Sequence, residues 1–181
     1  MARRNWRDTC SGEMVLRKVR VVEPNPDEIR ALGKFVLDAW KRAGPQALGW
    51  TEATEDTIHD IASKESLMEL VSDPKLKFFV CEENDEITGF ATNKVQDAST
   101  IELAGIIIRD DLLGKGIGSL LISKCIQSAR DNGFSDMVVK TEASNERAIS
   151  FYVKRGFVRL GNAVETVKNS KVDLATLRLV L

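Results

Sequence analysis

The chain has 181 residues, with 26 basic against 27 acidic side chains and a formal net charge of −1. This length predicts one domain, and the near-neutral charge argues against a surface that binds nucleic acid throughout. The longest run of apolar residues and glycine covers 103–108, far short of the roughly 18 residues that a membrane span needs. The basic first 20 residues lead into no continuous apolar stretch, so we expect no secretory signal.

The first half of the chain predicts a strand, two helices and a hairpin. Asn25 is placed to cap a helix that begins at Pro26, because both residue types are favoured at those positions. We expect a strand over 14–22, a helix over 26–43, a helix over 54–71 with room for a break near 63–66, and strands over 77–81 and 87–95.

The second half alternates strands and helices. We expect a strand over 100–108, a glycine-rich turn over 114–118, a helix from 117 to about 132, a strand over 137–141, a short helix that Ser144 can cap, and strands over 157–160 and 172–179. This order predicts an α/β (α+β) domain over residues 14–181, preceded by a basic extension over residues 1–13. Its sheet should be mixed, mostly antiparallel and seven-stranded, with about four helices.

Cysteine and histidine content limits the redox and metal chemistry. The three cysteines, Cys10, Cys81 and Cys125, are widely spaced and form no CxxC pair, which predicts a reduced, cytoplasmic protein. A zinc site would need these cysteines and His59 to converge from four distant segments, so we expect no metal. No nucleophile motif lies near His59, which disfavours a Ser-His-Asp triad.

Three glycines alternate in the turn between a buried strand and a helix: Gly114, Gly116 and Gly118. Glycine lets the backbone approach a ligand, and a helix N-terminus with unpaired N–H groups binds anions. The alternative is a tight turn without a ligand. The P-loop spacing does not fit this segment, and the dinucleotide pattern GxGxxG fails at Ser119, which disfavours a nucleotide-dependent oxidoreductase.

Two blocks in the second half carry a family resemblance. The sequence IIIRDDLLGKGIG over 106–118 resembles the acetyl-CoA motif Arg/Gln-x-x-Gly-x-Gly/Ala of the GNAT superfamily of N-acetyltransferases. The sequence NERAISFYVKRGF over 145–157 is similar to that family's N-x-x-A-x-x-F/L-Y-x-x-x-G-F block. The resemblance implies that acetyl-CoA donates an acetyl group to an amine by direct attack in a ternary complex.

The resemblance also implies a set of cofactor-binding residues. The backbone of Ile106, Ile107 and Ile108 should pair with the pantetheine arm, and Asn145 should contact the cofactor. The pyrophosphate should bind the backbone of Leu113, Gly114, Lys115, Gly116, Ile117, Gly118 and Ser119. Because Leu113 stands where the motif has Arg or Gln, and Asp110 and Asp111 lie just upstream, a second hypothesis stays open: an acyl-CoA-binding sensor without catalysis.

Three side chains are candidates for the chemistry. Glu102, a lone acid in an apolar strand, is the first candidate for a water-linked general base, and Glu142 is the reserve. The alternative for Glu102 is an exposed or ion-paired glutamate at a strand start. Tyr152, the one tyrosine of the chain, should act as the acid at the CoA thiolate by the resemblance. The alternative for Tyr152 is a packing aromatic.

The acceptor amine is open between a polyamine, an amino acid and a peptide or protein amine. Residues 51–70 hold six acids and one lysine, which can form an acidic wall for a cation or an ordinary solvated helix face. Trp50 can line the acceptor pocket. Lys140 stands where ribosomal-protein N-terminal acetyltransferases carry a glutamate, which counts against that specificity. A homodimer through residues 177–181 is a further possibility.

Overall fold

A computed structural model describes residues 17–43, 55–167 and 170–181. The strands are β1 (Arg17–Val21), β2 (Leu76–Glu83), β3 (Glu86–Val95), β4 (Thr100–Ile108), β5 (Asp136–Glu142), β6 (Val158–Val167) and β7 (Ser170–Val180). The helices are α1 (Pro26–Ala43), α2 (Glu55–Ile61), α3 (Lys64–Ser72), α4 (Ile117–Asp131) and α5 (Glu146–Val153), with a short 3₁₀ helix, η2 (Asp110–Leu112). The predicted basic extension over 1–13 and Trp50 lie outside the described residues.

The seven strands form one sheet in the order β1-β2-β3-β4-β5-β7-β6. Every neighbouring pair is antiparallel except β4 and β5, which are parallel. The predicted mixed, mostly antiparallel seven-stranded sheet is therefore confirmed.

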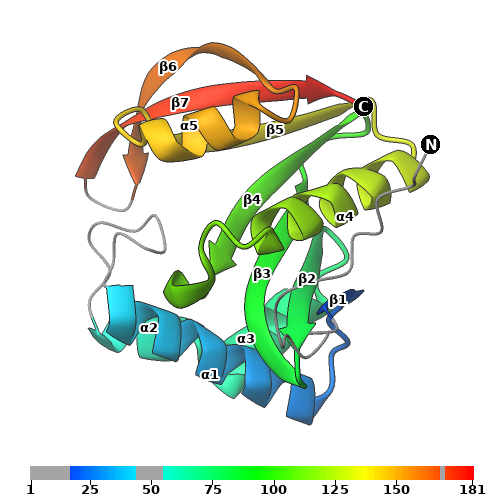
Figure 1. Cartoon of the computed structure of the whole chain (residues 1–181), viewed down its shortest axis with the longest axis vertical. Helices are drawn as coiled ribbons and strands as arrows, with labels where there is room; N and C mark the ends of the chain where they lie inside the picture. The colour runs from blue at the N-terminus through cyan, green and yellow to red at the C-terminus, as the bar shows by residue number, and fades with distance from the viewer. Residues whose placement is uncertain (1–16, 44–54, 168–169) are drawn as a thin grey trace, which may run out of the picture.

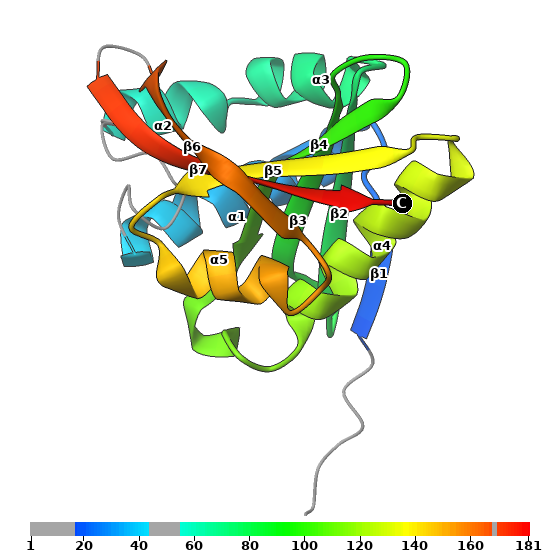
Figure 2. The same ribbon diagram turned by 90° about the horizontal axis from the view of Figure 1, so that it is seen from above.

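Helices cover both faces of this sheet, which lies between them in Figure 2. On one face, α4 and α5 bury a core that contains Leu121, Cys125 and Tyr152 together with residues of β2, β4, β5 and β7. On the other face, α1 and α3 pack Ile29, Leu32 and other apolar side chains against β2. The strands that carry the candidate site are thus held from both sides.

Local capping explains where three helices begin. Asn25 Oδ1 accepts a hydrogen bond of 3.0 Å from the Glu28 N–H, as predicted for the start of α1. Ser63 Oγ accepts one of 3.2 Å from the Ser66 N–H, which starts α3 and divides the expected second helix in two. The protein therefore has five α-helices in the described part rather than about four. The cap of α5 is Asn145 rather than the predicted Ser144.

The parallel pair in the middle of the sheet is short. β4 pairs with β3 from Ile101 to Ile108, but it pairs with β5 only where Thr100–Glu102 meets Asp136–Val138. Beyond this joint the two strands diverge, which Figure 1 shows for β4 in green and β5 in yellow. The sheet consequently consists of two halves that meet at three residue pairs.

Candidate functional site

The divergence leaves one edge of β4 without a strand over residues 103–108 in the described part of the chain. Side chains alternate along this segment. Ile106 and Ile108 pack into the core under α4, whereas Ile107 packs with α1 and α2 on the opposite face. An open backbone edge of this kind can accept an extended, amide-containing ligand as if it were another strand.

The glycine turn follows directly after this edge, and its glycines have different reasons to be there. Gly114 has φ 80° and Gly116 has φ 90°, a conformation that favours glycine, and a Cβ at either would meet open space. At Gly118 a Cβ would lie 2.8 Å from Ile108 Cδ1 and 3.2 Å from Phe151 Cζ. Gly118 therefore permits close packing, while Gly114 and Gly116 shape a turn that is open to solvent.

The turn presents the N-terminus of α4 without a side-chain cap. The N-cap residue is Gly116, which has no side chain that could accept a hydrogen bond from the first N–H groups of the helix. The first amide N–H groups of a helix have no intrahelical acceptor, and they carry the positive end of the helix dipole. Helix α4 has 15 residues, and its N-terminus is suited to bind an anion such as a pyrophosphate.

Charged side chains around the turn favour an anion further. Arg17 Nη1 donates a 2.7 Å hydrogen bond to the Lys115 carbonyl oxygen. The two upstream acids are paired: Arg109 Nε lies 2.8 Å from Asp111 Oδ1, and Arg42 Nε lies 3.6 Å from Asp110 Oδ1. These carboxylates therefore repel a bound phosphate less than the sequence alone implied. Leu113, at the expected Arg or Gln position, is 41% exposed and offers no polar group.

Tyr152 lies on α5 in the core next to α4. Its side chain is 5% exposed, and its ring centroid lies 5.3 Å from that of Phe151 and 5.6 Å from that of Phe157. Burial is the main cause that raises the pKa of Tyr152 to about 12. The raised pKa keeps the phenol neutral at physiological pH. No described residue hydrogen-bonds the hydroxyl, so its O–H group is available as a donor.

Asn145 caps the N-terminus of α5, a role that the resemblance did not indicate. Its Oδ1 accepts a 3.0 Å hydrogen bond from the Ala148 N–H and so caps α5. The oxygen is therefore committed to the helix, and the side-chain amide N–H groups remain for a ligand. Asn145 also fixes the start of the helix that carries Tyr152.

The two candidate bases lie at different ends of the β4–β5 pair. Glu102 belongs to the joint, where it faces Val138 across the strands, and its carboxylate accepts a hydrogen bond from Gln96. It is partly exposed rather than enclosed in an apolar pocket. Glu142 ends β5 beyond the divergence and is also partly exposed. The structure thus leaves both carboxylates within reach of water.

An apolar cluster on the α1–α2 side joins Trp40, Leu37 and Ile58 to Ile107 of β4. Trp40 Nε1 is buried and has no hydrogen-bond partner in the described part of the chain. In the sequence Trp40 was indistinguishable from an ordinary core position at helical spacing. Its place beside Ile107 makes it a candidate for the acceptor side, where the sequence pointed to Trp50.

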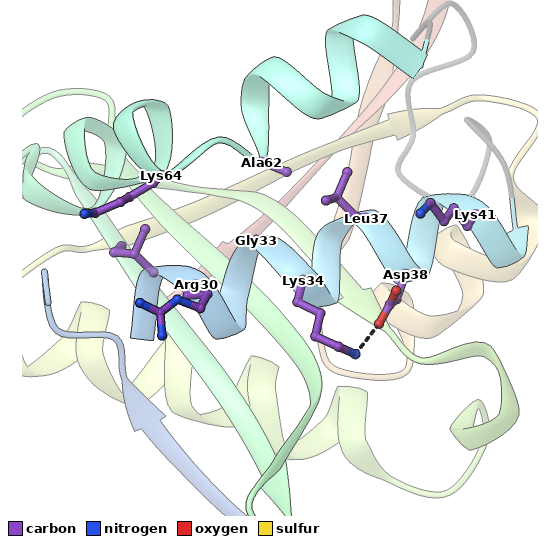
Figure 3. A pocket seen from close by; sticks show the side chains of 9 residues that line it. Arg30, Gly33, Lys34, Leu37, Asp38, Lys41, Ala62 and Lys64 are labelled. Atoms are coloured by element: carbon purple, nitrogen blue, oxygen red, sulfur yellow. Dashed lines mark hydrogen bonds and ion pairs between the residues drawn. The ribbon is translucent and has the colours of Figure 1, made fainter. Parts of the chain in front are cut away.

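A cavity of about 440 Å³ lies between α1 and the α2–α3 connection (Figure 3). It is lined by Ile29, Arg30, Gly33, Lys34, Leu37, Asp38, Lys41, Ala62 and Lys64. Figure 3 shows Lys34 directed along α1 to Asp38, and their ion pair measures 2.7 Å. This lining is basic and includes no residue of β4, β5 or the glycine turn, so the cavity is neither the predicted acidic wall nor part of the β4 edge.

The sheet edges bear on the predicted dimer. Leu177 and Arg178 of β7 pair with β5 on one edge and with β6 on the other, whereas Leu179 and Val180 pair with β5 alone. The dimer predicted through residues 177–181 stays a prediction. The open edge at this end belongs to β6, whose Val158, Leu160 and Val164 are exposed.

The described residues contain neither a candidate metal-binding cluster nor a helix that could span a membrane. No group of three or more His, Cys, Asp or Glu side chains is placed to hold a metal ion there. None of the described helices has the length and apolar character to cross a membrane.

Comparison with known proteins identifies relatives of this chain. The family model "Acetyltransferase (GNAT) family" matches residues 36–157. An uncharacterized N-acetyltransferase of Methanocaldococcus jannaschii is 33% identical over 86 residues, which are 44% of this chain and 38% of that protein. The chain spans about half the length, or less, of the curated relatives it matches.

Solved structures share the fold over most of the chain. The N-acetyltransferase from Staphylococcus aureus Mu50 has a TM-score of 0.68 and 25% identity, covering 91% of this chain and 98% of that one. The paia N-acetyltransferase from Thermoplasma acidophilum, in complex with coenzyme A, has a TM-score of 0.65 and 19% identity, covering 88% and 98%.

Proposed function

Because the chain belongs to the GNAT acetyltransferase family, we propose that it transfers the acetyl group of acetyl-CoA to a primary amine. The observation that carries this proposal is the continuity of two features. The open edge of β4 over 103–108 leads directly into the glycine turn and the uncapped start of α4. One extended ligand with a pantetheine arm and a pyrophosphate matches both features in chain order.

Backbone groups do most of the cofactor binding in this proposal. The edge of Ile106–Ile108 pairs with the amides of the pantetheine arm. The N–H groups at the start of α4, reached across Gly114 and Gly116, receive the pyrophosphate. Backbone donors do not depend on the side chain at position 113, so the binding mode survives the change to Leu113.

Bound acetyl-CoA supplies an activated thioester. Tyr152 acts at the sulfur side: its neutral phenol donates a hydrogen bond to the thiolate that develops as the bond breaks. Support comes from its burial, from a pKa of about 12 and from a hydroxyl without a described partner. A phenol that stays protonated throughout the physiological range suits a donor better than a base.

The acceptor must lose a proton before or during attack. A lysine-type amine, with a reference pKa near 10.4, needs about 4 kcal/mol of help at neutral pH, whereas an α-amino group near 8 needs much less. In our proposal Glu102 takes this proton through a water molecule, with Glu142 as the reserve base. The partly exposed carboxylates of both residues are compatible with a water relay.

The proposed acceptor is a polyamine, an amino acid, or a peptide or protein amine. Trp40, which packs in the same cluster as Ile107, is our candidate for a residue that lines the acceptor-binding site. The proposed cytoplasmic location is supported by Cys81 and Cys125, which are both buried and free. The proposed homodimer uses the C-terminal strand over 177–181, next to the exposed apolar side chains of β6.

Calorimetric titration of acetyl-CoA, followed by thiol release with a panel of amines, tests the proposal. We expect saturable binding and thiol release that depends on the amine. Binding without release by any amine in the panel would favour the alternative, a non-catalytic acyl-CoA sensor. Absence of binding would contradict both and leave the family membership as a statement about fold alone.

A further inference from the structure

The cofactor turn lacks the side chain that the acetyl-CoA motif places at its start. Leu113 is exposed and apolar, so it contributes nothing to a pyrophosphate. Backbone N–H groups at a helix end carry only partial charges. A doubly charged pyrophosphate therefore calls for a further cation near the first turn of α4.

Arg155 is held at that position by three contacts. Its Nη2 donates a hydrogen bond to Ser119 Oγ in the first turn of α4. Its Nη1 donates a 2.6 Å hydrogen bond to the Phe151 carbonyl oxygen. Its Cζ lies 3.5 Å from the centroid of the Phe151 ring, a cation–π arrangement.

The ring beneath Arg155 is itself fixed against the turn. Phe151 Cζ would lie 3.2 Å from a Cβ at Gly118, so a larger residue there would push the Phe151 ring back by a few tenths of an ångström. Gly118, Phe151 and Arg155 thus form a continuous packed path from the start of α4 to the guanidinium.

Arg155 also lacks the counter-charge that neighbouring arginines have. Arg17 pairs with Glu83 at 3.0 Å and Arg109 with Asp111 at 2.8 Å, but no described carboxylate pairs with Arg155. Burial lowers the pKa of Arg155, which shows that its charge is partly desolvated. A partly buried, uncompensated guanidinium with N–H donors to spare favours an anionic ligand.

We infer that Arg155 binds the pyrophosphate of CoA and takes over the position that Leu113 leaves vacant in the motif. This inference rests on the proposed function, because it assigns a further cofactor contact within the same site. It makes Arg155 a determinant of CoA affinity and gives it no part in proton transfer.

The test compares the variant Arg155→Gln with the control variant Arg147→Gln. Arg147 lies on α5, is exposed and has no described ion-pair partner. Calorimetry with CoA and with dephospho-CoA, which lacks the 3′-phosphate but keeps the pyrophosphate, measures the dissociation constants. We expect Arg155→Gln to weaken both ligands equally, by about 10- to 100-fold, the range for a hydrogen bond to a charged group. Arg147→Gln should leave both unchanged.

Turnover separates a binding contact from a structural one. At saturating acetyl-CoA, Arg155→Gln should keep the wild-type kcat and raise only KM, because Tyr152 stays in place. A matching loss of kcat would make Arg155 a packing residue and overturn the inference. If Arg155→Gln weakens the binding of CoA but not that of dephospho-CoA, Arg155 contacts the 3′-phosphate instead of the pyrophosphate, and the inference is overturned as well.

Restoring the motif provides an independent test. Leu113→Arg in the Arg155→Gln background returns a guanidinium to the turn and should recover at least half of the lost binding free energy. No recovery would show that Arg155 does not substitute for the motif side chain. If the wild type binds no CoA, the proposed function fails first; if the wild type binds and Arg155→Gln binds equally well, only the inference fails.

Discussion

Gly116 illustrates how a single backbone position can be required by a ligand rather than by packing. Its φ is 90° and a Cβ there meets nothing within 4 Å, so space alone does not demand glycine. The same description fits Gly133 beyond the far end of α4, with φ 79° and open space. Gly116 lies at the N-terminus of α4, where we propose that the pyrophosphate binds, whereas Gly133 follows the C-terminus of the same helix.

Gly116→Asp should therefore abolish CoA binding. A carboxylate at contact distance from a pyrophosphate opposes binding by about 4 kcal/mol at a partly exposed site, enough to lower affinity by at least ~100-fold. Gly133→Asp is the matched control: it should lose about 1 kcal/mol of stability, as Gly116→Asp does, and keep its affinity. Calorimetry and thermal melting of both variants provide the comparison. Retained affinity in a folded Gly116→Asp protein would remove the pyrophosphate from this turn.

Tyr152→Phe removes the proposed donor while it keeps the packing with Phe151 and Phe157. We expect kcat to fall by about 100-fold or more with little change in CoA affinity. Because the pKa of Tyr152 is raised to about 12, the neutral donor is present below that pH and is lost only above it. The rate should therefore rise with pH as the amine deprotonates and show no decline from Tyr152 up to about pH 10. A normal kcat in the variant would leave Tyr152 as a core residue.

What the sequence reveals about single residues depends on how local their causes are. The cap at Asn25 was predictable because its partner, Glu28, lies three residues away. The contact between Arg155 and Ser119 spans 36 residues and two helices, so Arg155 did not stand out in the sequence and Ser119 was predicted only as part of the glycine turn. Likewise, Gly118 looked like Gly114 and Gly116 until its neighbours from β4 and α5 were known.

At the scale of elements, our proposals place most of the side-chain chemistry of the site on or just after α5. It holds Phe151 and Tyr152, and Arg155 follows just after its end. This helix has only 8 residues, so its geometry depends strongly on the Asn145 cap. Asn145 is thus tied to activity even without a direct contact to the cofactor.

Asn145→Ala should lower stability by about 1 kcal/mol and also reduce kcat, since the loosened helix misplaces Tyr152. Asn25→Ala is the matched control: it removes an equivalent 3.0 Å cap from α1 on the other side of the sheet. It should lose similar stability and leave kcat unchanged. Urea melts and steady-state rates for both variants test this difference. Equal kcat losses would attribute the effect to stability alone.

Element boundaries followed the sequence closely where apolar periodicity and turn residues agree, as in β4 over 100–108. The divergence of β4 and β5 was beyond any sequence pattern, because no residue in either strand marks where their pairing ends. The resemblance supplied an expected cofactor edge at Ile106–Ile108, but the open backbone was visible only in the structure.

At the scale of the whole molecule, the two halves of the sheet are joined weakly at the β4–β5 pair. Only Thr100–Glu102 and Asp136–Val138 connect the strands, while β5, β7 and β6 pair extensively with one another. A ligand that lies along the open edge of β4 and reaches Arg155 beyond α5 contacts both halves. Its binding should hold together the part of the sheet that the protein itself leaves unpaired.

Acetyl-CoA should therefore stabilise the whole domain and protect a defined set of amides. At 100 times its dissociation constant, a ligand specific for the folded state adds about 2.7 kcal/mol, which corresponds to a rise in Tm of roughly 5–10 °C for a domain of this size. Hydrogen exchange should slow most at residues 103–108, where β4 has an open edge. Protection confined to other strands would mean that CoA does not bind along β4. Protection there with a smaller rise in Tm would mean that CoA also binds a state in which part of the domain has already unfolded.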